Sequence, residues 1–186
     1  MEEQEHILEV LKMTRDAVEN RNYFRIKELS NKFVHHCSIN QDADVISVAV
    51  IIYSLSKMIE RESYKKEKDW DKFYINYLEN IKNMIDALEK NNHKKFHEEI
   101  EKNSVLINRL SGNLRKNIID VFNRAKINKA SKIYEHGISM EKTAKIMGIS
   151  LWDLAEYSGQ TNVGDINLGF TMPLKERLKI AEEIFE

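Results

Sequence analysis

Apolar residues recur three and four positions apart along most of the 186-residue chain, which is the spacing of amphipathic helices. No segment alternates apolar and polar residues as a half-buried strand does. The chain has one proline and six glycines to interrupt helices, so the sequence predicts an all-α fold, an antiparallel helical bundle. The expected helices span residues 3–19, 23–37, 45–59, 69–88, 93–110 and 114–136. The clearest apolar stripe consists of Trp70, Phe73, Tyr77, Ile81, Met84 and Leu88.

Two stretches of the chain match each other at an offset of 70 residues. Residues 8–32 and 78–102 share nine identities over 25 positions without gaps. One interpretation is a pair of stacked three-helix units, neither of which buries its apolar face alone. The other is coincidence between charged helical hairpins, and the sequence leaves both open. We expect an N-terminal helical bundle over 1–112, followed by a basic helix, a helix-turn-helix and a tail helix over 113–186.

The segment 139–158 has the pattern of a helix-turn-helix. Ser139 can cap a first helix, and Gly148 stands where the tight turn needs a positive φ. Ser150 can cap the second helix, on which Leu154 and Tyr157 would face the first. A small residue, a turn glycine and buried apolar residues fall at the spacing that the motif needs.

Net charge changes this picture only locally. The whole chain has a formal net charge of −1, which argues against a generic polyanion binder. Between residues 109 and 132, however, seven basic residues stand against one acidic residue, directly before the helix-turn-helix. Such a patch can contact phosphates, and the start of the second motif helix can read the major groove. The expected DNA-binding residues are Arg124, Lys126, Lys129, Lys132, Lys142, Lys145, Ser150, Leu151, Trp152 and Ala155.

The composition of the second motif helix supports a different interpretation. None of its expected contact positions carries Arg, Lys, Asn or Gln, the usual readers of base edges. Asp153 and Glu156 on the same helix would repel phosphate. The alternative is therefore a protein-interaction module in which the helix-turn-helix is purely structural.

Residues 133–160 also resemble a known family. Ile133 to Ser139, followed by Thr143–Ala144 and the run from Gly148 to Leu154, looks like the helix-turn-helix of small archaeal antitoxins. The resemblance implies operator binding and neutralisation of a PIN-domain ribonuclease toxin, and it suggests an archaeal source. About 130 helical residues precede the motif here, whereas such antitoxins are typically much shorter.

The N-terminal helices resemble a second family more weakly, the helical HEPN ribonucleases. Ser30, Asn31 and His35 fall near that family's motif, but serine occupies the position where the family has arginine. Without that arginine, the charge that develops on phosphate in the transition state lacks its stabiliser. An active or inactive HEPN-like ribonuclease is thus a third hypothesis, and we expect no enzyme and no catalytic residue.

The remaining candidate chemistry is sparse. His35, His36, Cys37, Asp42 and Asp44 lie close in sequence, but their spacing matches no tetrahedral metal pattern, so no metal or cofactor is expected. A single cysteine and no apolar run long enough for a bilayer predict a cytoplasmic protein without a membrane association. Expected partners are double-stranded DNA, a toxin or other protein, and a second copy in a homodimer.

Overall fold

The computed structural model describes residues 2–40 and 43–160, with side chains described for 4–33 and 44–160. Every regular element in this part of the chain is helical, which confirms the predicted all-α bundle. A short 3₁₀ helix, η1 (Glu62–Lys66), follows the third helix. The α-helices are α1 (Glu2–Glu19), α2 (Tyr23–Asn40), α3 (Ala43–Glu60), α4 (Trp70–Glu89), α5 (His93–Asn108), α6 (Gly112–Glu135), α7 (Met140–Met147) and α8 (Leu151–Gln160). The tail helix predicted after residue 172 lies outside the described residues.

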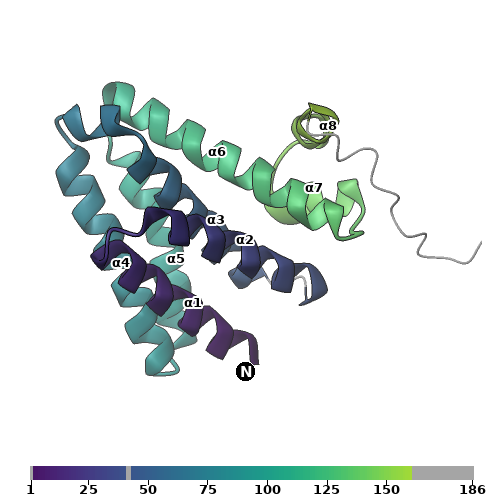
Figure 1. Ribbon diagram of the computed structural model, residues 1–186, viewed down its shortest axis with the longest axis horizontal. Coiled ribbons are helices and arrows are strands. Elements are labelled where there is room, and N and C mark those ends of the chain that lie inside the picture. Colours follow the sequence, from purple (N-terminus) through teal and green to yellow (C-terminus); the bar gives the residue numbers. More distant parts are fainter. Residues whose placement is uncertain (1, 41–42, 161–186) are drawn as a thin grey trace, which may run out of the picture.

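The apolar stripe of α4 faces the hydrophobic core of the bundle. All six residues of that predicted stripe are buried, and the Tyr77 hydroxyl donates to the Ile51 carbonyl of α3 at 2.9 Å. Helix α3 is apolar nearly all round and lies in the middle of the bundle, with α2 and α6 packed against it (Figure 1). No described helix combines the length and the apolar character that crossing a membrane requires.

The turns of the α1–α2 and α4–α5 hairpins share one geometry, 70 residues apart. Arg21 and Asn91 adopt left-handed φ angles of 54° and 53°. In each turn the next residue, an asparagine, donates its backbone N–H back to an alanine carbonyl at 2.8 Å, as in a Schellman cap. The side chains of Asn22 and Asn92 then cap α2 and α5 by accepting a backbone N–H three residues on. The sequence match therefore coincides with a repeated local structure.

The two three-helix units, α1–α3 and α4–α6, also pack on each other reciprocally. Helix α1 lies against its counterpart α4, and α3 lies against its counterpart α6. The cross-contacts correspond too, since α2 touches α6 and α5 touches α3. Lys12 forms an ion pair with Glu89 at 2.6 Å, and the counterpart residues Lys82 and Glu19 line one groove between α1 and α4. The contacts between the units thus follow the repeat, although α2 packs on α3 far more extensively than α5 packs on α6.

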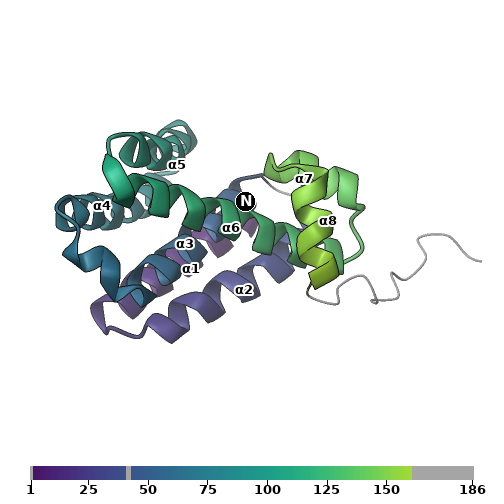
Figure 2. The same ribbon diagram turned by 90° about the horizontal axis from the view of Figure 1, so that it is seen from above.

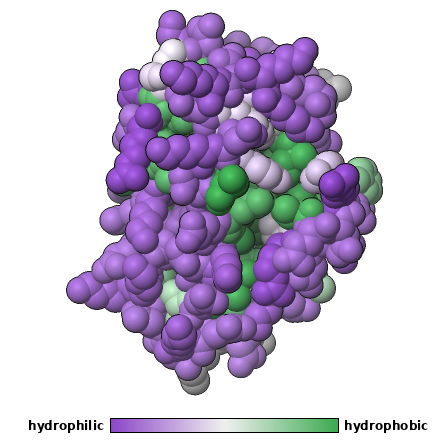
Figure 3. Space-filling view, turned by 90° about the vertical axis from the view of Figure 1, so that its left-hand side faces the viewer, coloured by the Kyte–Doolittle hydropathy of each residue, from purple (hydrophilic) through white to green (hydrophobic). Residues whose placement is uncertain are grey.

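Most of the molecular face that carries α4 is polar. Figure 3 shows charged and polar residues over much of this face, with an apolar area exposed in the middle. The groove between α1 and α4 contains four apolar residues, Val18, Ile75, Leu78 and Ile81. Helices α7 and α8 lie at the opposite end of the molecule, where both pack on α6 (Figure 2). Of the bundle helices, α6 therefore makes most of the contacts with the predicted motif.

Candidate functional site

The α7–α8 pair is built by the local interactions that its sequence predicts. Ser139 Oγ accepts the Lys142 backbone N–H at 3.3 Å at the start of α7. Gly148 ends α7 with φ 60° and ψ 42°, and the Ile149 N–H closes the turn on the Ala144 carbonyl at 3.1 Å. Ser150 Oγ then accepts the Asp153 N–H at 3.0 Å and caps α8. A left-handed glycine between two capped helices fixes where each helix starts and stops.

Buried residues attach this pair to α6. Ala144, Met147 and Leu154 are buried between α6, α7 and α8, and Ile149 packs against them at the corner. The side-chain amide of Asn128 on α6 donates to the Tyr157 hydroxyl of α8 at 2.9 Å. Tyr157 was expected to face α7, but its hydroxyl contacts α6 instead. The pair therefore has a fixed orientation relative to the bundle.

The first turn of α8 exposes two large apolar side chains. Trp152 is 84% exposed and Leu151 is 47% exposed, whereas Ala155 is half-buried. We call Leu151 and Trp152 the apolar tip. Asp153 and Glu156 are also exposed, so the side of α8 beside the tip is acidic. Of the predicted base-contacting residues, Ser150 is exposed but its oxygen is already engaged in capping the helix.

Lys129 was predicted to lie on an exposed basic surface, and this prediction is wrong. The residue is 0% exposed, with its ammonium 4.0 Å from the centre of the Tyr53 ring. It donates to Asn31 Oδ1 on α2 at 2.8 Å. A charged group enters an interior where a hydrogen-bond acceptor and an aromatic face replace its water. Lys129 thus joins α6 to α2 and α3, and it cannot reach a phosphate.

The other predicted basic residues of α6 do not form one surface. At about 100° per residue, Arg124 and Lys126 point to nearly opposite sides of the helix. They line different grooves, Arg124 beside α8 and Lys126 beside α5 and α7. Arg124 pairs with Asp120 at 2.9 Å, and Lys132 pairs with Glu135 at 2.7 Å. The excess of positive charge seen in the sequence is therefore spread around α6.

Lys142 and Lys145 keep the exposure expected of them. Both lie on the outer side of α7, three residues apart and hence on neighbouring positions of one helix face. Among the predicted basic contacts, these two are exposed and form no ion pair in the described part of the chain. They give the α7–α8 pair a small positive region beside its acidic helix.

A groove of about 550 Å³ separates α8 from the bundle. Lys57 of α3, Arg61 just after α3 and Arg124 of α6 line it on one side. Asp153 and Glu156 line it from α8. Burial raises the pKa of Tyr53 in this groove, and the nearby Tyr157 and Glu60 raise it further. Charges of both signs line the groove, so it does not gather one sign of charge.

The other predicted candidates are either structural or lie outside the described side chains. Ser30 is buried and its hydroxyl donates to the Ala49 carbonyl at 2.9 Å. Asp44 Oδ2 lies 2.9 Å from His97 Nε2 of α5. The side chains of His35, His36, Cys37 and Asp42 are not among those described. Within the described side chains, no three His, Cys, Asp or Glu residues gather as metal ligands.

Sequence reasoning missed a buried polar network between α4 and α5, centred on Glu99. The side chain of Glu99 is 0% exposed, and Lys95 and Lys102 both pair with it, at 2.9 and 2.5 Å. A signal was available, because Asn76, Asn80 and Asn83 recur at helical spacing along the edge of the α4 stripe. Only the regular apolar stripe beside these asparagines entered the sequence-based prediction.

Comparison with known proteins gives no relative of this chain. No protein-family model, no curated protein and no solved structure matches it. The resemblance of residues 133–160 to archaeal antitoxins, and the weaker one to HEPN domains, therefore stay predictions.

Proposed function

We propose that this chain is a protein-interaction module that presents the apolar tip of α8 to a partner protein. The observation that supports this proposal is the 84% exposure of Trp152 at the first turn of a helix that Leu154 and Ser158 anchor by their burial. A solvated indole is costly relative to a buried one, and tryptophan is among the residues that dominate binding energy at protein interfaces. Leu151 beside it enlarges the apolar area that a partner could cover.

The charges around the tip favour a protein over duplex DNA. Asp153 and Glu156 stand beside it on α8, where they would repel phosphates and attract basic side chains. A fitting partner surface has an apolar socket for the indole and a basic rim for these two carboxylates. The resemblance to archaeal antitoxins makes a PIN-domain ribonuclease the first partner class to test, with the chain acting as its inhibitor.

A binding assay with matched variants tests this proposal. A purified PIN-domain ribonuclease is titrated with wild-type protein, with Trp152→Ala and with Phe24→Ala. Phe24 is a second exposed aromatic residue, 72% exposed on α2 and away from the tip. We expect Trp152→Ala to weaken binding roughly thirtyfold or more, as for an interface anchor, and Phe24→Ala to leave it unchanged. Equal affinity of all three proteins would argue against the tip as the interface.

Duplex DNA binding is a second candidate function, favoured by Lys142 and Lys145. Both are exposed on α7 next to the start of α8, where a helix-turn-helix protein contacts the DNA backbone. Because the basic residues of α6 are buried, paired or on other faces, these two lysines would supply most of the phosphate contacts. A salt titration of duplex binding distinguishes the two candidates.

A further inference from the structure

The second three-helix unit buries polar side chains where the first buries apolar ones. At the 70-residue offset, three core positions change from apolar to polar, and both members of every pair are buried. The counterpart pairs are Val10 and Asn80, Leu29 and Glu99, and Phe33 and Asn103. We call Asn80, Glu99 and Asn103 the acceptor cluster. In the first unit, apolar residues fill these positions of the hairpin.

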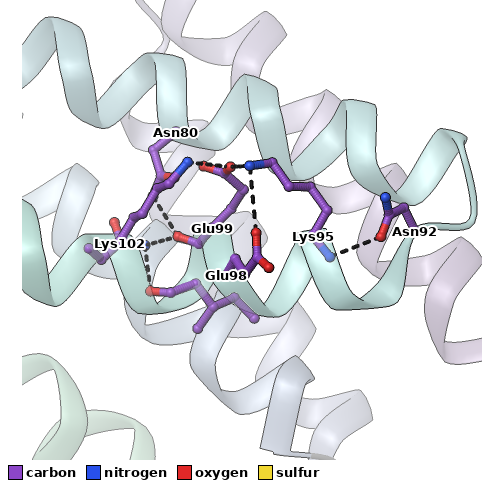
Figure 4. A network of polar contacts seen from close by, with 8 residues as sticks. Asn80, Asn92, Lys95, Glu98, Glu99 and Lys102 are labelled. Atoms are coloured by element: carbon purple, nitrogen blue, oxygen red, sulfur yellow. Dashed lines mark hydrogen bonds and ion pairs between the residues drawn. The ribbon is translucent and has the colours of Figure 1, made fainter.

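The repeated hairpin pattern does not by itself explain why polar groups are buried at these positions. A buried amide or carboxylate without full hydrogen bonding destabilises the folded state, whereas the apolar counterparts stabilise the core. The acceptor cluster uses part of its hydrogen-bonding capacity within the protein. Asn80 Nδ2 donates to the Glu99 carbonyl at 2.9 Å, and Lys95 and Lys102 donate to Glu99 Oε1 (Figure 4).

One acceptor atom of each residue in the cluster has no hydrogen-bond donor among the described residues. These atoms are Asn80 Oδ1, Glu99 Oε2 and Asn103 Oδ1. The amide nitrogens of both asparagines donate to backbone carbonyls, which fixes their oxygens as the unused atoms. The lysine contacts outweigh the effect of burial and hold the pKa of Glu99 below its ordinary value, so its carboxyl group is ionised at neutral pH. Each residue of the cluster thus keeps one buried acceptor atom that no described donor uses.

Two of these residues line a pocket between α4 and α5. Its volume of about 200 Å³ is several times the roughly 30 Å³ of one liquid water, so a small organic molecule fits. Asn80 and Glu99 line it, together with Glu79 on α4, Lys102 on α5 and Arg109, the residue that follows α5. Two carboxylates and two cations line the pocket, so the lining has no net charge. Both cations, Lys102 and Arg109, come after Glu99 in the sequence. Val105 and Leu106 add apolar wall.

We propose that this pocket binds a free α-amino acid. Its ammonium group has three N–H donors, which match Glu99 Oε2, Asn80 Oδ1 and the carboxylate of Glu79. Its carboxylate faces Lys102 and Arg109, and guanidinium groups bind carboxylates in a bidentate manner. The apolar wall takes a small side chain. The site is separate from the α7–α8 pair, so its test and the partner test fail independently.

Thermal unfolding of the full chain tests the proposal. Each proteinogenic L-amino acid is added at millimolar concentration, with methylammonium chloride and sodium acetate as single-charge controls. We expect at least one amino acid to raise the Tm in a concentration-dependent manner, while neither control salt does so at the same ionic strength. If no amino acid exceeds the two salts, the proposal is overturned.

Matched variants locate the binding. Arg109→Gln removes an exposed guanidinium that lines the pocket, and Glu79→Gln removes an exposed carboxylate. Each should raise the Kd roughly tenfold or more, because a charge-assisted hydrogen bond is lost. Arg115→Gln is the control, since Arg115 is exposed on α6 and does not line the pocket. Wild-type affinity in Arg109→Gln and Glu79→Gln would overturn the assignment of the site.

Discussion

The ammonium nitrogen of Lys129 lies 4.0 Å from the centre of the Tyr53 ring, inside the bundle. It also donates to Asn31 at 2.8 Å, so one side chain of α6 connects α2 and α3. Truncation in Lys129→Ala removes a cation–π contact and a charged hydrogen bond. We expect a loss of about 2 to 4 kcal/mol in the free energy of unfolding, measured by urea titration.

Arg124→Ala is the control for this change. Arg124 is exposed and pairs with Asp120 on the surface of α6, so its loss should cost about 0.5 kcal/mol or less. If Lys129→Ala were as stable as Arg124→Ala, the buried position of Lys129 would be contradicted. A phosphate-binding lysine would instead leave stability unchanged and lower only affinity for nucleic acid.

The sequence could predict what depends on neighbours in the chain. The α4 stripe is regular over five turns, and the caps of α7 and α8 need only residues within a few positions of one another. Lys129 was misplaced because its partner Asn31 is 98 residues away. Seven basic residues within a short span looked like one surface, although their helical angles spread them around α6.

The Glu99 network could not be predicted from the sequence for the same reason, because it depends on residues far apart in the chain. A Lys and Glu-rich helix such as α5 normally keeps its charges in solvent, and its composition does not reveal which glutamate faces inward. The packing of α5 against α4 decides that. The sequence repeat contained the needed comparison, since Leu29 is the counterpart of Glu99. That comparison becomes informative once both positions are known to be buried.

The turn between α7 and α8 should depend on the backbone of Gly148. Its φ is 60°, and a Cβ placed there meets no other atom within 4 Å, so Gly148→Ala adds only conformational strain. We expect a cost of roughly 1 to 2 kcal/mol in unfolding free energy. Gly159→Ala, within α8 and equally free of contacts, should be neutral or slightly stabilising. A neutral Gly148→Ala together with a destabilising Gly159→Ala would contradict a left-handed turn at Gly148.

Acid should weaken the α4–α5 hairpin through Glu99. Burial raises the pKa of this carboxyl, but the hydrogen bonds from Lys102 and Lys95 outweigh burial and leave it lowered. A lowered pKa in the folded state stabilises the protein above the ordinary value of 4.5, and this contribution is lost as pH falls further.

Urea unfolding of wild type and Glu99→Gln across this range measures the effect. The difference in stability between the two proteins should be largest at neutral pH and shrink toward about pH 3. Glu89→Gln, which breaks an exposed pair with Lys12, serves as the comparison. A difference that stays constant with pH would contradict the ionised, lysine-bound state of Glu99.

Duplex DNA should bind weakly and with a shallow salt dependence. Only Lys142 and Lys145 of the predicted basic contacts are exposed beside α8 without an ion pair among the described residues. Two phosphate contacts give a slope of about −2 in a plot of log K against log salt concentration. We expect fluorescence anisotropy to show this slope at low salt and no binding at physiological salt. A much steeper slope, or tight binding at physiological salt, would favour the DNA-binding function.

The most direct test of the central claim replaces Trp152 with a photo-cross-linking amino acid in cells that produce this chain. Phe24, exposed to a similar degree, is replaced in a matched experiment. We predict that position 152 cross-links to one defined protein in clear excess over position 24, and that little nucleic acid is captured. Cross-linking of position 152 to nucleic acid, or equal protein yields at both positions, would contradict the proposal that the tip of α8 binds a partner protein.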